Sequence, residues 1–160
     1  MEGLNSFIHG SVICNLEHTD KFQAIHELIE KAPIFKKVGN RKKIEHAVVQ
    51  REYIESTGLG KGVAVAHGKC PQVKQVLVAL GISRRGVQFD SVDGSPVNFL
   101  FLVANPPKAW DEYLETLSDL VTMMRDSRFR RLLLKRGNEY RIEGILHRKM
   151  EALSHHRRSA

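Results

Sequence analysis

The histidine that ends a short apolar run is the side chain best suited to chemistry. His67 follows residues 62–66 (GVAVA) and precedes Gly68. Such a run predicts a buried strand, so the backbone of His67 should be rigid while the glycine leaves its ring uncovered. Because the ordinary pKa of histidine is about 6.5, the ring is largely neutral and nucleophilic near neutral pH. Such a ring could accept a phosphoryl group, although a purely structural hydrogen bond is the commoner role of a histidine at the end of a strand.

Two cations could neutralise that phosphoryl group. Lys69 is two residues further along the chain, and the backbone N–H groups of residues 68–70 could turn toward an anion. Arg51 lies three residues after Val48 and seven after Ile44, on the inward face of a predicted helix. An arginine on such a face needs an anionic partner or a cleft. Positioning and charge neutralisation are the main requirements of phosphoryl transfer, and these residues supply both.

The other seven histidines show no comparable surroundings. Each is expected at the surface or its edge: His9, His18, His26, His46, His147, His155 and His156. None has metal-ligand spacing with supporting residues, apart from the adjacent pair in the tail, which would chelate weakly in any protein. The sequence also lacks the nucleophile-elbow, Walker and zinc-protease motifs. We predict no metal site and no cofactor.

Composition indicates a globular protein without a membrane span. The chain has 160 residues, of which 42% are hydrophobic and 27% are charged, as in ordinary globular domains. Its longest apolar stretches, such as residues 99–104, are too short to span a bilayer, and no signal peptide is recognisable. Cys14 and Cys70 are isolated, which fits a reducing compartment. We therefore predict a cytoplasmic location.

The net charge of +7 comes from the C-terminal part of the chain. Residues 125–160 contain 11 Lys or Arg and 4 Asp or Glu, whereas the first 124 residues contain 14 of each. The densest stretch is residues 125–136 (RDSRFRRLLLKR). A solvated helix face is the usual explanation, so nucleic-acid or membrane-surface binding is the less favoured interpretation. An acidic partner protein would be a milder form of the same electrostatics.

Interleaved strand and helix patterns predict an α/β (or α+β) fold. Strands are predicted at residues 12–16, 63–66, 76–82 and 97–104. Helices are predicted over residues 20–31, 40–55, 110–124, 127–134 and 139–153, and a loop over the glycine-rich residues 56–62. We expect a three-layer α/β/α sandwich with a mixed, mostly parallel sheet of about five strands flanked by helices. Residues 1–153 should form a single domain and residues 154–160 a basic, disordered tail.

The segment around His67 resembles a family signature. Residues 50–69, QREYIESTGLGKGVAVAHGK, are similar to the signature of fructose/mannitol-type (type 2) enzyme IIA domains of the bacterial phosphoenolpyruvate-dependent sugar phosphotransferase system (PTS). The likeness continues in residues 86–106, GVQFDSVDGSPVNFLFLVANP, and in residues 113–133, YLETLSDLVTMMRDSRFRRLL. It covers residues 11–135, and a stand-alone chain of this size most resembles the nitrogen-regulatory enzyme IIA.

The resemblance implies a phosphocarrier. In this family the histidine matching His67 accepts phosphate from a small HPr-type carrier and donates it to a cysteine of enzyme IIB, and the arginine matching Arg51 lies beside it. Nitrogen-regulatory members instead bind target proteins according to their phosphorylation state. Four residues of the matched segment are expected to contact the phosphate: Gly68, Lys69, Ser56 and Thr57.

Two positions depart from the family pattern. Ala66 replaces a proline before the histidine, and Tyr113 replaces the second active-site histidine. Tyr113 is on the apolar face of its helix, where it is either a core side chain or a phenol that donates a hydrogen bond to His67 or its phosphate. A phenol carries no positive charge near neutral pH, so phosphate transfer could be slowed or lost.

Three functional hypotheses remain from the sequence. The first is a regulatory phosphocarrier, and its metabolic variant is a sugar-specific enzyme IIA that serves a separate enzyme IIB. The second is a binding module that has lost phosphotransfer, so the sequence leaves open whether the chain is an enzyme. The third is binding of nucleic acid or a membrane surface through the basic C-terminal region.

Overall fold

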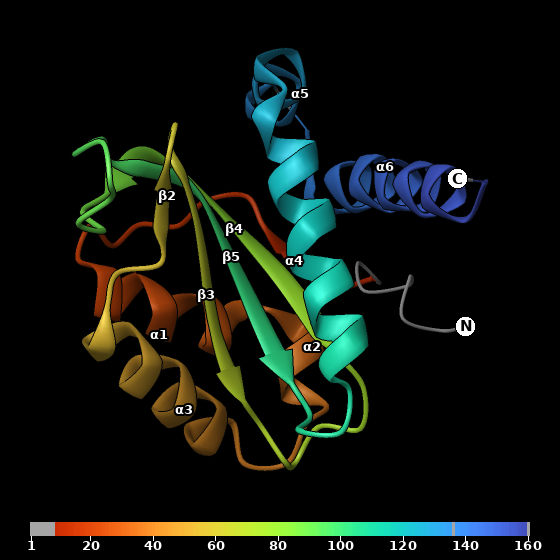
Figure 1. Ribbon diagram of the computed structural model, residues 1–160. Helices are drawn as coiled ribbons and strands as arrows, with labels where there is room; N and C mark the ends of the chain where they lie inside the picture. The colour runs from red at the N-terminus through yellow and green to blue at the C-terminus, as the bar shows by residue number, and fades with distance from the viewer. Residues whose placement is uncertain (1–8, 136, 160) are drawn as a thin grey trace.

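A five-stranded mixed sheet forms the middle layer of the molecule (Figure 1). This computed structural model describes residues 9–135 and 137–159. The strands are β1 (Val12–Ile13), β2 (Gly58–Gly60), β3 (Val63–Lys69), β4 (Leu77–Val87) and β5 (Val97–Asn105), in the order β1-β4-β5-β3-β2. The predicted mixed sheet of about five strands is confirmed, but "mostly parallel" is wrong. β1–β4 and β3–β5 are parallel, whereas β4–β5 and β2–β3 are antiparallel because their connections are too short for a crossover.

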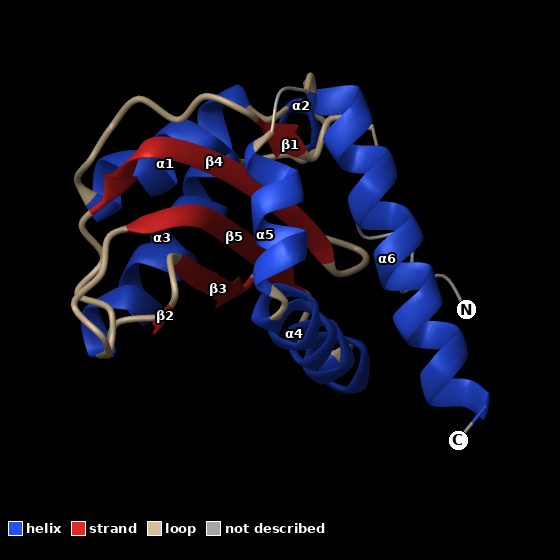
Figure 2. Ribbon diagram, turned by 90° about the horizontal axis from the view of Figure 1, so that it is seen from above, coloured by secondary structure: helices blue, strands red, loops and turns tan. Residues whose placement is uncertain are grey.

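Helices cover both faces of the sheet (Figure 2), which confirms the predicted three-layer architecture. One face is covered by α1 (Lys21–Lys31), α2 (Pro33–Lys36) and α3 (Arg41–Ile54), and the other by α4 (Trp110–Arg125), α5 (Ser127–Leu134) and α6 (Glu139–Ser159). Side-chain caps define three helix starts, because Asp20, Asn40 and Asp126 accept hydrogen bonds from the first-turn N–H groups of α1, α3 and α5.

Alternation along the central strands separates two hydrophobic cores. Ala64 and Leu100 face α1–α3, whereas Val65 and Val103 face α4–α6. The same alternation continues to the strand ends, so His67 and Lys69 of β3 share the α4 side with Asn105 of β5. The register pairs His67 with Val103 and Lys69 with Asn105. The fold therefore brings polar residues of two strands to one edge of the sheet.

The prediction of a loop over the glycine-rich segment 56–62 is only partly right. Gly58–Gly60 forms β2, antiparallel to β3. A Cβ at Gly58 would lie 2.3 Å from Ser91 Oγ and 2.9 Å from Ser91 Cα. This glycine therefore serves close packing rather than flexibility.

Residues 154–159 of the tail predicted to be disordered are helical, and residue 160 lies outside the described residues. α6 continues past residue 153 to Ser159, and Ser154 is buried. The end of the helix is held by Arg157, which forms ion pairs with Asp119 and Glu115 of α4. Burial of Asp119 raises the pKa of that carboxyl, and Arg157 opposes the rise. None of the helices in the described part of the chain is both long and apolar enough to cross a bilayer.

Candidate functional site

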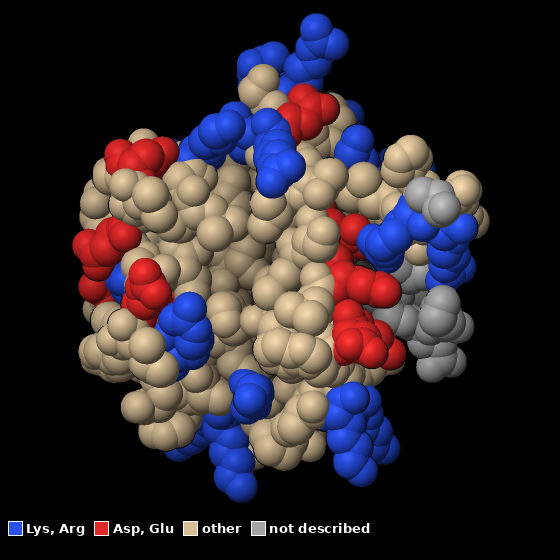
Figure 3. Space-filling model, viewed as in Figure 1, with Lys and Arg blue, Asp and Glu red and all other residues tan. Residues whose placement is uncertain are grey.

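A pocket of about 500 Å³ lies where β3 and β5 end between α3 and α4. Its lining residues come from α3 (Ala47, Gln50, Arg51, Ile54), from the ends of β3 and β5 (His67, Gly68, Lys69, Asn105) and from α4 (Trp110, Tyr113). Figure 3 shows that this side of the molecule is largely uncharged between α3 and α4, with acidic and basic side chains at its margins. The C-terminal edge of parallel strands is a common place for ligand binding in α/β proteins.

The His67 ring is held in one tautomer. Its Nδ1 lies 3.0 Å from the carbonyl oxygen of Val65. Because a carbonyl oxygen only accepts hydrogen bonds, Nδ1 carries the proton and Nε2 keeps a free lone pair in the neutral ring. Burial lowers the pKa of His67, and the charge of Arg51 lowers it further, against the opposite effect of the Val65 carbonyl. The ring is therefore neutral and nucleophilic at physiological pH.

We expect His67 to titrate below the ordinary histidine value of about 6.5. The unfolded chain then binds the proton more tightly than the native protein. Protonation of His67 consequently costs folding stability as pH falls from about 6.5 through the native pKa, and it contributes nothing above that range. Imidazole NMR signals of the wild-type protein give the titration midpoint directly. A midpoint at or above 6.5 would contradict the assignment.

Arg51 is brought to the same pocket by α3. Its Nη1 donates a 2.7 Å hydrogen bond to the carbonyl oxygen of Glu55 at the end of the helix. Among residues 9–135 and 137–159, no carboxylate forms an ion pair with Arg51. Its charge is therefore uncompensated beside His67, and its other N–H groups remain available for an anion.

Gly68 allows this helix to lie directly on the strand. A Cβ at Gly68 would be 2.8 Å from the backbone nitrogen of Val48 and 2.9 Å from the carbonyl carbon of Ala47. Arg51 follows Ala47 by one helical turn. The sequence suggested that the glycine leaves the imidazole uncovered; in the structure it lets α3 approach β3, and so brings Arg51 toward His67.

Replacement Gly68→Ala should destabilise the protein by about 1–3 kcal/mol, because the added methyl group meets helix backbone that cannot turn aside. Urea unfolding measures the change. Gly39→Ala is the matched control, since nothing lies within 4 Å of a Cβ at that position. Equal stability of the two variants would show that α3 does not need the close approach.

Aromatic side chains form the α4 wall of the pocket. The Tyr113 ring centroid lies 5.6 Å from that of His67 and 5.4 Å from that of Trp110. Burial raises the pKa of Tyr113, so the phenol keeps its proton. Lys69 is exposed, and its Nζ lies 6.0 Å from the Trp110 ring centroid. Tyr113 is thus both a core side chain and a neutral neighbour of His67.

Ser56 and Thr57 do not line the pocket, contrary to the expectation that they contact phosphate. The hydroxyl of Ser56 donates to the carbonyl oxygen of Phe89, and the hydroxyl of Thr57 donates to Glu52 Oε1 at 2.5 Å. Both hydroxyls therefore secure the junction between α3 and β2. The Cys70 N–H, predicted to be free for an anion, donates to the backbone oxygen of Asn105 at 2.7 Å.

Asn105 is a pocket residue that the sequence reasoning missed. It ends the apolar run of β5 just as His67 follows an apolar run in β3. The sequence did contain a signal for this pocket residue, because Asn105 is a polar residue directly after the apolar run of β5. Its significance depends on the parallel pairing of β3 with β5, since parallel strands end at one edge.

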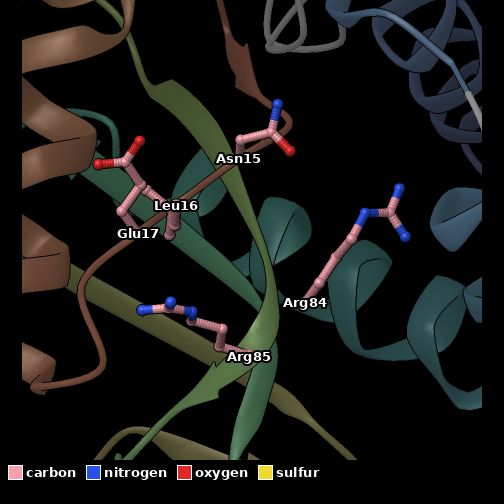
Figure 4. A pocket seen from close by; sticks show the side chains of 5 residues that line it. All are labelled: Asn15, Leu16, Glu17, Arg84 and Arg85. Atoms are coloured by element: carbon pink, nitrogen blue, oxygen red, sulfur yellow. The ribbon is translucent and has the colours of Figure 1, made fainter.

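A second pocket, of about 330 Å³, is a weaker candidate for anion binding. It is lined by Asn15, Leu16, Glu17, Arg84 and Arg85. Figure 4 shows the two guanidinium groups pointing to opposite sides of β4, as expected for consecutive strand residues. Arg84 also donates a 2.7 Å hydrogen bond to the carbonyl oxygen of Leu134. The two charges therefore do not converge on one ligand.

Within the described residues, no three His, Cys, Asp or Glu side chains are grouped as metal ligands would be.

Residues 6–149 match the family model described as "Phosphoenolpyruvate-dependent sugar phosphotransferase system, EIIA 2". The chain is 33% identical over 132 residues to the fructose-specific EIIABC component of Bacillus subtilis, covering 82% of this chain and 21% of that protein. It therefore spans about a fifth of that relative. It is 32% identical over 116 residues to the nitrogen regulatory protein of Bradyrhizobium diazoefficiens, covering 72% of this chain and 75% of the relative.

Solved structures show the same fold. Nitrogen regulatory protein IIA-Ntr from Neisseria meningitidis superposes with a TM-score of 0.77 at 29% identity, covering 86% of this chain and 93% of that one. Mannitol enzyme IIA from Escherichia coli, in complex with phosphorylated enzyme IIB, superposes with a TM-score of 0.71 at 18% identity, covering 87% and 95%.

Proposed function

Because this chain belongs to the EIIA 2 family of the phosphoenolpyruvate-dependent sugar phosphotransferase system, we propose that it is a phosphocarrier in which His67 Nε2 accepts a phosphoryl group. The hydrogen bond from His67 Nδ1 to the Val65 carbonyl carries the proposal, since it leaves the lone pair on Nε2 in a ring that lines the pocket. The uncompensated charge of Arg51 supports it.

The proposed step needs no change in the protonation of the ring. The lone pair of Nε2 forms a bond to phosphorus while the bond between phosphorus and the donor atom breaks, and that electron pair stays with the donor. In the return step a partner's nucleophile forms the new bond to phosphorus, and the electron pair of the N–P bond returns to Nε2. The protein supplies position and positive charge.

Partner proteins are part of the proposal. The phosphate donor is an HPr-type carrier. In the metabolic form the acceptor is a separate enzyme IIB, like the partner in the mannitol complex. In the regulatory form the protein passes phosphate to no acceptor and instead binds target proteins according to its phosphorylation state. The similarity to nitrogen regulatory proteins favours regulation. Phosphorylation adds close to two negative charges at the pocket. Exposed apolar side chains beside it, Ile54, Trp110 and Leu114, support docking of a partner there.

The free, buried Cys14 and Cys70 support a cytoplasmic location.

Incubation of the chain with phosphoenolpyruvate, enzyme I and HPr tests the proposal. We expect stoichiometric incorporation of an acid-labile, alkali-stable phosphate, as for an N–P bond. Omission of HPr should prevent labelling. A chain that remains unlabelled with an active donor, under conditions that label a known enzyme IIA, would contradict the proposal.

A binding module without phosphotransfer is the second candidate, because Tyr113 presents a neutral phenol beside His67. In that case the wild-type chain stays unlabelled, and Tyr113→His restores labelling by supplying a side chain that can carry a positive charge. Equal labelling of wild type and Tyr113→His would count against this candidate.

A further inference from the structure

Asn105 contains an unsatisfied polar atom in the wall of the pocket. Only 2% of the residue is exposed, and its Oδ1 is buried with no hydrogen-bond partner. Buried polar groups are nearly always paired, because an unpaired one costs free energy. Gln72 and Ser91 have similar unpartnered atoms, but neither residue lines the pocket. The exception at Asn105 therefore points to a ligand that is bound only part of the time.

The parallel register places Asn105 near His67. Asn105 is paired with Lys69, two residues beyond the pair His67–Val103, and all four side chains project from the same face. Neighbouring strands are about 4.8 Å apart, and diagonal side chains lie roughly 7–8 Å apart or less. Both His67 and Asn105 line the pocket. The Asn105 backbone is fixed by the Cys70 N–H, so only its carboxamide has to adjust.

The other donors of the pocket leave room for one more. A phosphoryl group has three oxygens, and each is stabilised by N–H or O–H donors. One N–H of Arg51 already donates to Glu55, and the Lys69 ammonium lies near the Trp110 ring. Tyr113 offers a single neutral hydroxyl. A carboxamide turns easily about its terminal torsion and can present its N–H groups instead of its oxygen.

We propose that Asn105 is a phosphoryl-binding residue, whose carboxamide donates a hydrogen bond to the phosphoryl group on His67. The inference rests on the proposed phosphocarrier function and extends it. Asn105 neither forms nor breaks a covalent bond and remains neutral throughout.

The variant Asn105→Ala separates this role from a structural one. Its phosphorylation rate at limiting phospho-HPr should fall by roughly ten- to hundredfold, the usual effect of losing a hydrogen bond to a charged group. Its melting temperature should stay equal to or rise above that of wild type, because an unsatisfied buried oxygen is removed. Asn105→Asp should be slower still, because a carboxylate repels the phosphoryl group.

Asn98→Ala is the matched control. Asn98 lies near the other end of β5, and its Nδ2 donates a 2.9 Å hydrogen bond to the carbonyl oxygen of Ser83. This variant should lose stability but keep the wild-type phosphorylation rate. A second measurement needs no mutation: on phosphorylation of ¹⁵N-labelled wild-type protein, the side-chain amide signals of Asn105 should shift while those of Asn98 stay in place.

The outcomes distinguish this inference from the proposed function. If wild type carries phosphate on His67 while Asn105→Ala reacts within twofold of wild type and the Asn105 amide signals stay in place, the inference is wrong and the function stands. A marked loss of stability in Asn105→Ala would also overturn it, because the amide would then serve the fold. If wild type takes up no phosphate, the proposed function fails and this inference fails with it.

Discussion

Replacement of His67 by glutamine is expected to abolish phosphate incorporation completely. Glutamine keeps a polar side chain of similar reach but has no ring nitrogen that can form and release an N–P bond. The ring of His67 is also the only imidazole among the residues that line the pocket. Phosphate incorporation from phosphoenolpyruvate through enzyme I and HPr, followed by mapping of the labelled peptide, gives the result.

The control for this experiment is His46→Gln, on the exposed surface of α3 and outside the pocket. It should label like wild type. Circular dichroism should show that both variants are folded, because His67 makes a single hydrogen bond to its own strand and its loss should cost about 0.5–1.5 kcal/mol. Residual label on His67→Gln, at another histidine, would move the acceptor away from this pocket and overturn the assignment.

Loss of Arg51 is expected to have the second largest effect. Arg51→Ala should slow phosphorylation by about 10²–10³, the usual effect of removing one preorganised donor from a site of developing charge. Two properties support so large a value: the guanidinium shares the pocket with His67, and no described carboxylate neutralises it. Single-turnover transfer from phospho-HPr separates this chemical effect from weaker docking.

Arg51→Lys should lie between alanine and wild type, because lysine keeps the charge and loses the bidentate geometry. Arg41→Ala, at the start of the same helix and outside the pocket, should behave as wild type. The His67 titration provides an independent check: Arg51→Ala should raise its midpoint toward the ordinary value, because the Arg51 charge lowers that pKa. A normal transfer rate in Arg51→Ala would exclude the guanidinium from phosphate binding.

Local patterns were sufficient for most of the elements and for the candidate reactive group. Apolar runs identified the central strands, and the helices predicted from residues 20 and 127 begin at Lys21 and Ser127. His67 stood out because it follows a core strand directly. These features depend on neighbours within a few residues, and the sequence displays such neighbours.

Contacts between distant residues decided the remaining features. The final helix continues past residue 153, where Arg157 pairs with Asp119 of α4, so a segment that looks disordered locally is held in place. Ser56 and Thr57 resemble phosphate ligands, but their hydroxyls are bound to Phe89 and Glu52. The bond from Ser56 to Phe89 exists only once the segment after β4 is packed beside residue 56.

The pocket itself depends most on tertiary structure. The sequence by itself was enough to predict that a neutral imidazole at a strand end is the reactive group. Only the close approach of α3 to Gly68 put Arg51 in the same pocket, and only the parallel register of β3 and β5 added Asn105. The physical reason is that reactivity belongs to one side chain, whereas binding an anion requires several groups to converge, and convergence is a property of packing.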